Sequence, residues 1–170
     1  MTFEALVAAA MAAPIEGWRF PFLEERIERD EPSWDWTAMA ADVVRGARTA
    51  LDHGTGGGEV LADVLAAAGS VPALTVATEG YPPNVAVAAQ RLGPLGVAVV
   101  HVHGGTFNSH GPGPASRRMP FFDGWLDAFL VRNGAFCPAE VFRLLRPGGR
   151  LQFQSGLVGP RRPGQVELQE

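Results

Sequence analysis

The chain contains no lysine, and all 14 of its basic residues are arginine. The absence of lysine excludes a Schiff-base lysine and therefore pyridoxal-phosphate chemistry. It also excludes the lysine of a phosphate-binding loop, so a nucleotide hydrolase of that class is ruled out. The net charge is −4 and no long basic run is present. We therefore expect no nucleic-acid partner.

Cysteine is nearly absent as well. Cys137 is alone, so no internal disulfide can form, and a reducing cytoplasmic location is expected. The apolar N-terminus lacks a positively charged start and carries Glu4, which argues against a signal peptide. No apolar run is long enough to cross a bilayer, so no membrane partner is expected.

The composition is typical of a globular protein, since 46% of the residues are hydrophobic and 19% are charged. Short apolar runs alternate with helical stretches, which predicts a doubly wound α/β fold with a mostly parallel sheet of about five strands and helices on both faces. We expect a single domain, with an N-terminal helical cap over 1–46, an α/β core over 47–156 and a tail over 157–170. The expected strands are 49–52, 73–79, 97–102, 126–131 and 150–155, and the expected helices are 2–12, 22–29, 32–47 (capped by Ser33), 58–69, 84–93 and 138–145.

A glycine-rich turn follows the first expected strand, in the stretch LDHGTGGGEV at 51–60. Glycines let the backbone turn tightly and approach a ligand closely. The dinucleotide pattern G-x-G-x-x-G needs glycine at position 59, which is Glu59. The pattern that fits is acid-x-G-x-G-x-G, beginning at Asp52. A plain strand-to-helix turn is the alternative interpretation.

A second acid, Glu79, ends the second expected strand. A carboxylate at this place can accept hydrogen bonds from ribose hydroxyls, in dinucleotide sites and in other nucleoside sites alike. The alternative is an ordinary solvated acid at a strand end.

Three segments in order, LDHGTGGGEV, VATEGYPPNVAVAAQRL and MPFFDGWLDAFLVRNGAFCPAEVFRLLRPGGRLQFQ, resemble the motifs of class I S-adenosylmethionine-dependent methyltransferases over about residues 14–156. The resemblance implies that Asp52 and the loop backbone hold the methionine part of the cofactor. It places Glu79 at the ribose, and Arg132 with Asn133 between cofactor and acceptor. Trp18 closes over the pocket or belongs to the core. The implied cofactor-binding set is Trp18, Asp52, His53, Gly54, Thr55, Gly56, Glu79, Gly80, Tyr81, Asn108, Arg132 and Asn133.

The sequence departs from the family pattern at three places. No acid follows the third strand, and Asn108 is the best substitute for contacting the adenine amine. After the fourth strand, VRNGAF replaces the histidine and glutamate of the resembling subgroup with Asn133 and Gly134. The chain after residue 156 is too short for the usual final hairpin. The fifth strand is then a bare edge, which predicts a homodimer or a partner that covers it. The alternative is a chain that is naturally or artificially shortened.

Catalytic candidates are His103, His110 and a water oriented by Asn133, since histidine titrates near neutral pH. His101, His103 and His110 together are a poor metal set, so no metal is expected. Cys137 is expected to be a packed residue at a helix start.

The resemblance implies methyl transfer from S-adenosylmethionine to a small-molecule substrate, with S-adenosylhomocysteine as product. The alternative is a non-methylating relative that binds the cofactor or acts as an auxiliary or binding subunit in a biosynthetic pathway. A nicotinamide-dependent oxidoreductase is disfavoured by Glu59.

Overall fold

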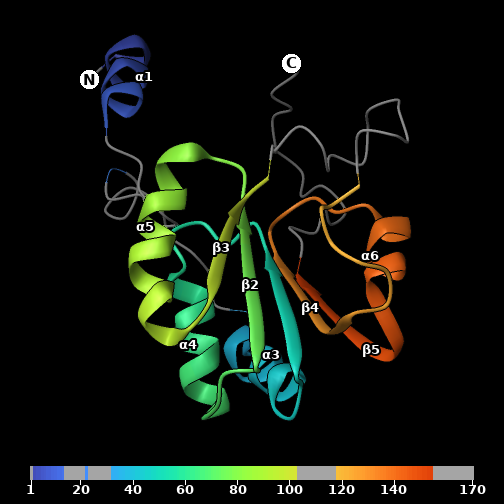
Figure 1. Cartoon of the computed structure of the whole chain (residues 1–170). Coiled ribbons are helices and arrows are strands. Elements are labelled where there is room, and N and C mark those ends of the chain that lie inside the picture. Colours follow the sequence, from blue (N-terminus) through green and yellow to red (C-terminus); the bar gives the residue numbers. More distant parts are fainter. Residues whose placement is uncertain (1, 14–21, 23–31, 103–117, 155–170) are drawn as a thin grey trace.

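A parallel sheet of five strands forms the centre of the molecule in a computed structural model that describes residues 2–13, 22, 32–102 and 118–154. The strands are β1 (Thr49–His53), β2 (Leu74–Glu79), β3 (Ala98–His101), β4 (Leu126–Arg132) and β5 (Leu145–Gln154). They are arranged in the order β3-β2-β1-β4-β5 (Figure 1), with every pairing parallel. The predicted fold class is confirmed. Since β1 and β4 lie in the middle, their carboxyl ends meet at the centre of one sheet edge.

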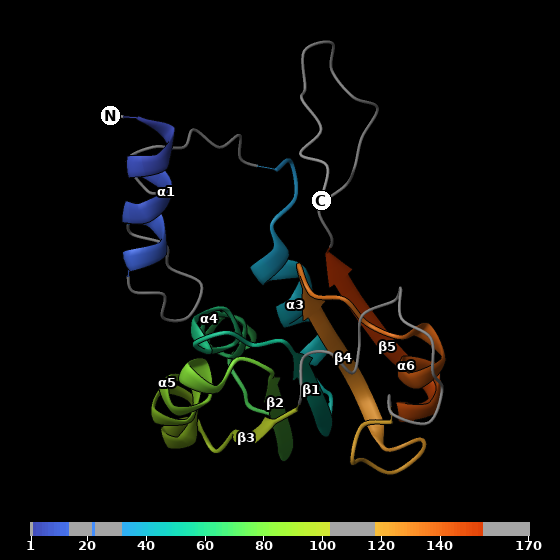
Figure 2. The ribbon, with the colours of Figure 1, turned by 90° about the horizontal axis from the view of Figure 1, so that it is seen from above.

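Three helices cover one face of the sheet: α3 (Trp36–Val44), α4 (Glu59–Ala68) and α5 (Pro82–Leu92) (Figure 2). Their buried residues share one hydrophobic cluster with Ala50, Ala77, Ala128 and Leu130 of the strands. α3 contributes five buried residues, although it falls within the predicted N-terminal cap. Residues that alternate with these strand positions point to the other face.

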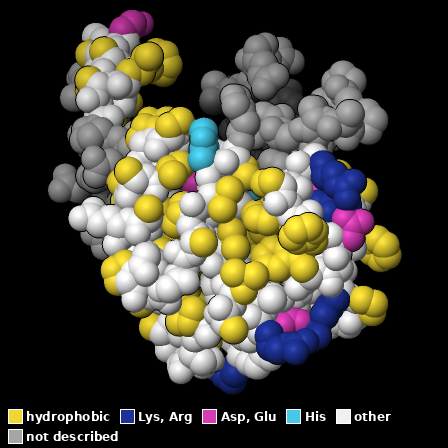
Figure 3. All heavy atoms as spheres, viewed as in Figure 1, with side chains coloured by type: hydrophobic (Ala, Val, Ile, Leu, Met, Phe, Trp, Pro, Cys, Tyr) yellow, Lys and Arg dark blue, Asp and Glu magenta, His cyan; other side chains and the backbone are white. Residues whose placement is uncertain are grey.

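The opposite face is covered by α6 (Pro138–Leu144) and by residues 118–125. Leu51, Phe129 and Val131 are buried beneath them. Around β2 and β3 this face has no helix of the described chain over it, and hydrophobic side chains gather there (Figure 3). Leu74 is accordingly exposed to 48%.

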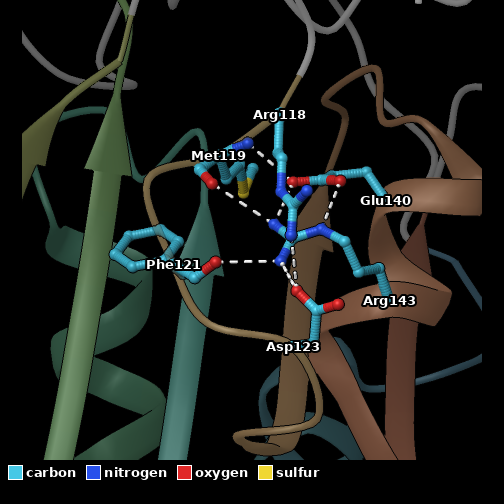
Figure 4. A network of polar contacts seen from close by, with 6 residues as sticks. All are labelled: Arg118, Met119, Phe121, Asp123, Glu140 and Arg143. Carbon is cyan, nitrogen blue, oxygen red and sulfur yellow. Dashed lines mark hydrogen bonds and ion pairs between the residues drawn. The ribbon is translucent and has the colours of Figure 1, made fainter. Parts of the chain in front are cut away.

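A dense polar network fixes α6 to the segment that leads into β4 (Figure 4). The Arg143 guanidinium donates to Glu140 Oε2 at 2.8 Å, to Asp123 Oδ1 at 2.6 Å and to the Phe121 carbonyl at 2.9 Å. Glu140 also accepts from the Met119 backbone N–H at 2.6 Å. The guanidinium is satisfied from several directions, so its contribution is structural.

Several element boundaries differ from those expected. The N-cap of α3 is Asp35, whose Oδ1 accepts from the Ala38 N–H at 3.0 Å, so the predicted Ser33 cap is wrong. β5 begins at Leu145, earlier than expected, and its pairing with β4 shifts register between Leu126 and Ala128. An added Cβ at Gly149 would lie 2.8 Å from the Leu126 carbonyl oxygen, which explains the glycine.

α1 (Phe3–Ala12) matches the first expected helix and buries none of its residues. The short 3₁₀ turn η1 (Gly93–Leu95) follows α5. The expected helix at 22–29 lies outside the described residues except for Phe22. A search of the described helices finds no membrane-spanning candidate.

Candidate functional site

The loop between β1 and α4 carries three glycines with positive φ: Gly54 at 72°, Gly56 at 62° and Gly58 at 79°. This left-handed conformation is costly for residues with a Cβ. A Cβ on Gly58 would also lie 2.7 Å from Leu92 Cγ, whereas one on Gly54 would meet nothing within 4 Å. The glycine at 58 therefore serves packing against α5, and the glycine at 54 leaves open space beside the loop.

The amide groups of this loop are largely engaged within the protein. Gly54 N–H and Thr55 N–H both donate to the Thr78 carbonyl at 2.9 Å, and Gly58 N–H donates to the Thr55 carbonyl at 3.1 Å. They are consequently not directed at a phosphate, in contrast to the loop of a dinucleotide site.

Glu79 connects the glycine loop to the start of α5. Its Oε2 accepts from Gly56 N–H at 2.6 Å, and its Oε1 accepts from Gly80 N–H and Tyr81 N–H, both at 2.7 Å. A carboxylate has about four acceptor positions. Three are used here, so Glu79 retains capacity for one further donor while it holds the loop in place.

Asp52 lies on the same face as Ala50, beside the glycine loop. Burial raises the pKa of its carboxyl to about 6; the nearby Thr55 hydroxyl opposes this increase, and the Glu79 charge adds to it. No cationic side chain is among the causes. Thr55 Oγ1 is itself buried without a hydrogen-bond partner. Asp52 thus has the Thr55 hydroxyl beside it and no cationic partner, and both side chains offer acceptor oxygens next to the glycine loop.

His53 points to the opposite face of the sheet. Its Nδ1 lies 2.9 Å from Thr78 Oγ1, its Nε2 lies 3.2 Å from the Ala135 carbonyl oxygen, and its ring packs against Phe129. The carbonyl can only accept, so Nε2 carries the proton in the neutral ring and Nδ1 accepts from Thr78. Burial is the main cause that lowers the pKa of His53 to about 4. This histidine is a neutral structural link between β1 and the β4–α6 connection.

The end of β4 carries Arg132, which alternates with Leu130 and so faces the same side as Asp52. Arg132 Nε is buried without a partner, and so is Oε1 of Gln154, the residue paired with Arg132 in β5. Asn133 has φ 56°, a conformation that asparagine tolerates, and donates its N–H to the Gln154 carbonyl at 2.7 Å. A Cβ on Gly134 would lie 3.0 Å from Val131 Cγ2. The backbone conformation thereby explains Asn133, and the close approach to the Val131 side chain explains Gly134.

Ten of the proposed cofactor-binding residues lie at the carboxyl edge of β1, β2 and β4: Asp52, His53, Gly54, Thr55, Gly56, Glu79, Gly80, Tyr81, Arg132 and Asn133. The side chain of His53 faces away from the other nine. Trp18, His103, Asn108 and His110 lie outside the described residues. Gln154 was missed, because its position opposite Arg132 depends on a strand register that the sequence does not reveal.

Two further residues have side chains that can react or bind a metal. Cys137 is partly buried at the N-cap of α6, and His101 is exposed at the end of β3. Within the described ranges, no group of three or more histidine, cysteine, aspartate or glutamate side chains is placed to hold a metal ion.

Comparison with solved structures identifies the fold. A methyltransferase from Aquifex aeolicus, described as S-adenosylmethionine-dependent, has a TM-score of 0.50 and 20% identity, over 69% of this chain and 61% of that one. A putative S-adenosylmethionine-dependent methyltransferase from Methanococcus maripaludis has a TM-score of 0.53 and 16% identity, over 71% and 55%. The [4+2]-cyclase SpnF has a TM-score of 0.52 and 20% identity, over 88% and 55%.

These likenesses show that the chain has the class I methyltransferase fold suggested by its sequence motifs. The chain spans 55% to 61% of the length of these three structures. No protein-family model matches the sequence, and no curated protein matches it.

Proposed function

We propose that this protein binds S-adenosylmethionine at the carboxyl edge of β1, β2 and β4. The observation that carries the proposal is the Asp52 carboxylate, which has no cationic partner and lies beside open space at Gly54, with the buried Thr55 hydroxyl next to it. The ionised form of a buried carboxylate has an unfavourable free energy when no cation is nearby, and a positively charged ligand group stabilises it. The loop amides are already bonded, so a ligand with an ammonium group and no phosphate suits this place.

Each residue has a defined task in this proposal. Asp52 and Thr55 accept hydrogen bonds from the amino-acid end of the cofactor. Glu79 offers its remaining acceptor position to the ribose, while Gly80 and Tyr81 lie beside the adenine. Asn108 and Trp18 are proposed to complete the adenine side and the closure of the pocket.

The reaction we propose is methyl transfer to a small molecule. S-adenosylmethionine supplies an activated methyl group when it is bound. The contribution of the chain is to hold the acceptor in line, beside Arg132 and Asn133. Proton removal from the acceptor is assigned to His103, His110 or a water held by Asn133. His53 is unsuited to this task, because it is buried on the opposite face and its pKa is lowered to about 4.

Calorimetric titration with S-adenosylmethionine, S-adenosylhomocysteine and NAD⁺ tests the cofactor. We expect both sulfur compounds to bind and NAD⁺ to give no heat. Absence of binding by both sulfur compounds would disprove the proposal. A screen of small-molecule acceptors, followed through formation of S-adenosylhomocysteine, then tests transfer.

The second candidate is a non-methylating protein that binds the same cofactor. Two observations favour it: local conformation and packing explain Asn133 and Gly134 without a catalytic role, and a structure with the same fold is described as a cyclase. Cofactor binding without transfer across a broad acceptor screen would support this candidate.

We also propose that a second copy or another protein covers β5. This strand is an edge of the sheet, and its Phe153 is exposed to 54%. Exposed edges are usually paired or covered. Light scattering is expected to give a dimer mass, and a clean monomer at micromolar concentration would contradict self-association.

A further inference from the structure

One helix and one face of the sheet are apolar and stand without a packing partner in the described chain. The helix is α1, which buries none of its residues. Its large apolar side chains recur at intervals of three and four residues and therefore share one side of the helix, which we call the apolar stripe: Phe3, Leu6, Val7 and Met11. Phe3 is exposed to 74% and Met11 to 83%. A stripe of this kind is normally buried against another element, so α1 has the surface of a packed helix.

The sheet face belongs to β2 and β3 and lies opposite α4 and α5. We call it the β2–β3 face and define it by Leu74, Val76, Ala98 and Val100, which share one side because Ala98 pairs with Val76. Val100 packs against the hydrophobic cluster beneath α6, which fixes the side. Leu74 is exposed to 48%, and Ala98 is exposed as well. Figure 3 shows hydrophobic side chains gathered over these strands, with no charged side chain among them.

An aromatic margin borders the β2–β3 face on one side. Phe121 points from the segment before β4 toward β1 and β2 (Figure 4), and its ring lies 5.4 Å from that of Trp125. Both aromatic side chains are only partly buried. On the other side β3 is the outermost strand, so the face is open there. The surface is therefore apolar, bounded along one side, and accessible to a helix that lies along the strands.

The two unpartnered surfaces agree in length and in charge. The ten residues of α1 make a helix about 15 Å long, and the six residues of β2 extend over about 20 Å. Glu4 is at the margin of the apolar stripe, where it can remain in solvent when the stripe is buried. α1 has no basic residue, which disfavours an anionic lipid surface as its partner.

The α1 helix of a second copy fits the β2–β3 face better than the chain's own helix does. Figures 1 and 2 place α1 on the side of the sheet that α3, α4 and α5 cover. Residues 14–31, which join α1 to the next described stretch, can span up to about 60 Å when extended, so α1 can reach another molecule. Reciprocal exchange forms the contact twice, which doubles the buried area toward the roughly 1,000 Å² that a specific interface needs.

We propose that the protein forms a symmetric dimer in which α1 of each copy packs its apolar stripe on the β2–β3 face of the other. This contact does not depend on cofactor binding. It also differs from the covering of β5, because β3 and β5 lie at opposite edges of the sheet.

Light scattering of the full chain with one variant on each surface tests the contact. Leu6→Glu places a charge in the apolar stripe, and Leu74→Glu places one on the β2–β3 face; both leucines are partly exposed, so both variants should fold. Wild type is expected to be a dimer at micromolar concentration, and each variant should weaken the dimer at least about 30-fold, the size of a lost hot-spot contact. Met39→Glu on α3 is the matched control, because Met39 is exposed to 45% on the other side of the sheet. This control should remain a dimer.

Mixing the two variants distinguishes exchange between copies from packing within one chain. The Leu6→Glu chain keeps an intact face and the Leu74→Glu chain keeps an intact helix, so an equimolar mixture should regain one contact and form heterodimers. Cross-linking gives a second measurement. In a Cys137→Ser background, one chain carries Ala10→Cys in α1 and the other carries Ala98→Cys in β3. Oxidation of the mixture should give a covalent dimer in larger amount than either chain gives alone.

Several outcomes would overturn the proposal. A wild type that is monomeric at micromolar concentration is one, and monomers that cosediment with phosphatidylcholine vesicles would assign α1 to a membrane surface instead. A dimer that survives Leu6→Glu and Leu74→Glu but is lost in Phe153→Glu would be held by the β5 edge. A cross-link that forms within a chain carrying both cysteines, and not between mixed chains, would show that α1 packs on its own sheet. Should Leu74→Glu fail to fold, the cross-linking decides, because it uses only small substitutions.

Discussion

Replacing Asp52 by asparagine is expected to stabilise the protein at neutral and alkaline pH while it weakens the proposed cofactor binding. Burial raises the pKa of Asp52 from 3.8 to about 6 in the folded state. The folded protein therefore favours the protonated carboxyl more than the unfolded chain does. The resulting stability is fully present below about pH 4 and is lost as pH rises through about 6.

The magnitude follows from the size of this shift. About two pKa units at about 1.4 kcal/mol each correspond to about 3 kcal/mol of lost stability at pH 8. At pH 5 the folded carboxyl is mostly protonated, and the loss is about 1.5 kcal/mol. Asparagine has nearly the shape of the protonated acid and carries no charge, so the variant should escape this penalty.

Urea unfolding of wild type and Asp52→Asn at pH 5 and pH 8 measures the effect. The stability advantage of the variant should rise from about 1.5 to about 3 kcal/mol between these pH values. Asp63→Asn removes an exposed carboxylate of α4, and it is expected to stay within about 0.5 kcal/mol of wild type at both. An advantage independent of pH, or a variant less stable than wild type at pH 8, would refute the reasoning.

Three further predictions concern stability. His53 has its pKa lowered to about 4, so the protein loses stability as pH falls below about 6.5, and between pH 7 and pH 5 wild type should lose about 2 kcal/mol more than His53→Gln in urea unfolding. Arg143→Met removes the ion-pair partner of the Glu140 carboxylate and should cost about 3 kcal/mol. Adding Glu140→Gln should restore part of that loss, and equal stability of the single variant and wild type would contradict the network. Gly54→Ala and Gly58→Ala both force alanine to a positive φ, which should cost about 1 kcal/mol of stability. Only Gly58→Ala also meets the Leu92 side chain, so it should lose about 2 kcal/mol or more, and thermal unfolding ranks the two variants. Calorimetry should show weaker binding of S-adenosylhomocysteine to Gly54→Ala.

The inner strands β2 and β4 could be predicted because they are short and mainly apolar. β2 and β4 are buried along nearly their whole length, which is the composition expected of inner parallel strands. Helix starts were less predictable where two residues can serve as caps. Ser33 and Asp35 are both suitable types, and the packing of Trp36 against the core selects Asp35. The early start of β5 depends on a register shift at Gly148 and Gly149, which the local sequence pattern does not predict.

The site was predictable in position and only partly in orientation. The glycine motif and Glu79 locate it, because the ends of parallel strands share one edge. The His53 side chain points away, since strand residues alternate between faces and Asp52 occupies the face of α4. Asn133 and Gly134 replace side chains expected from the family pattern, and the positive φ of Asn133 and the contact of Gly134 with the Val131 side chain explain the change.

The pKa of a buried aspartate is shifted in opposite directions at the two ends of the sheet. Near the amino ends of β1 and β4, burial opposes ionisation of Asp127, but the N–H groups of Arg48 and Thr49 and the charge of Arg146 lower its pKa. At the carboxyl edge Asp52 lacks such partners and its pKa is raised.

Unsatisfied groups collect at the same carboxyl edge. Three of the four buried unpartnered side-chain atoms of the described chain, on Thr55, Arg132 and Gln154, lie there, and the fourth is Trp125 Nε1 before β4. At the amino ends of the strands the chain supplies partners for the buried Asp127 carboxylate. The same fold is therefore able to satisfy buried groups at the carboxyl edge. Because the unpartnered groups at the carboxyl edge are a hydroxyl, a guanidinium and a side-chain amide, the free energy they cost is most simply recovered by a polar ligand, rather than by further packing of the chain.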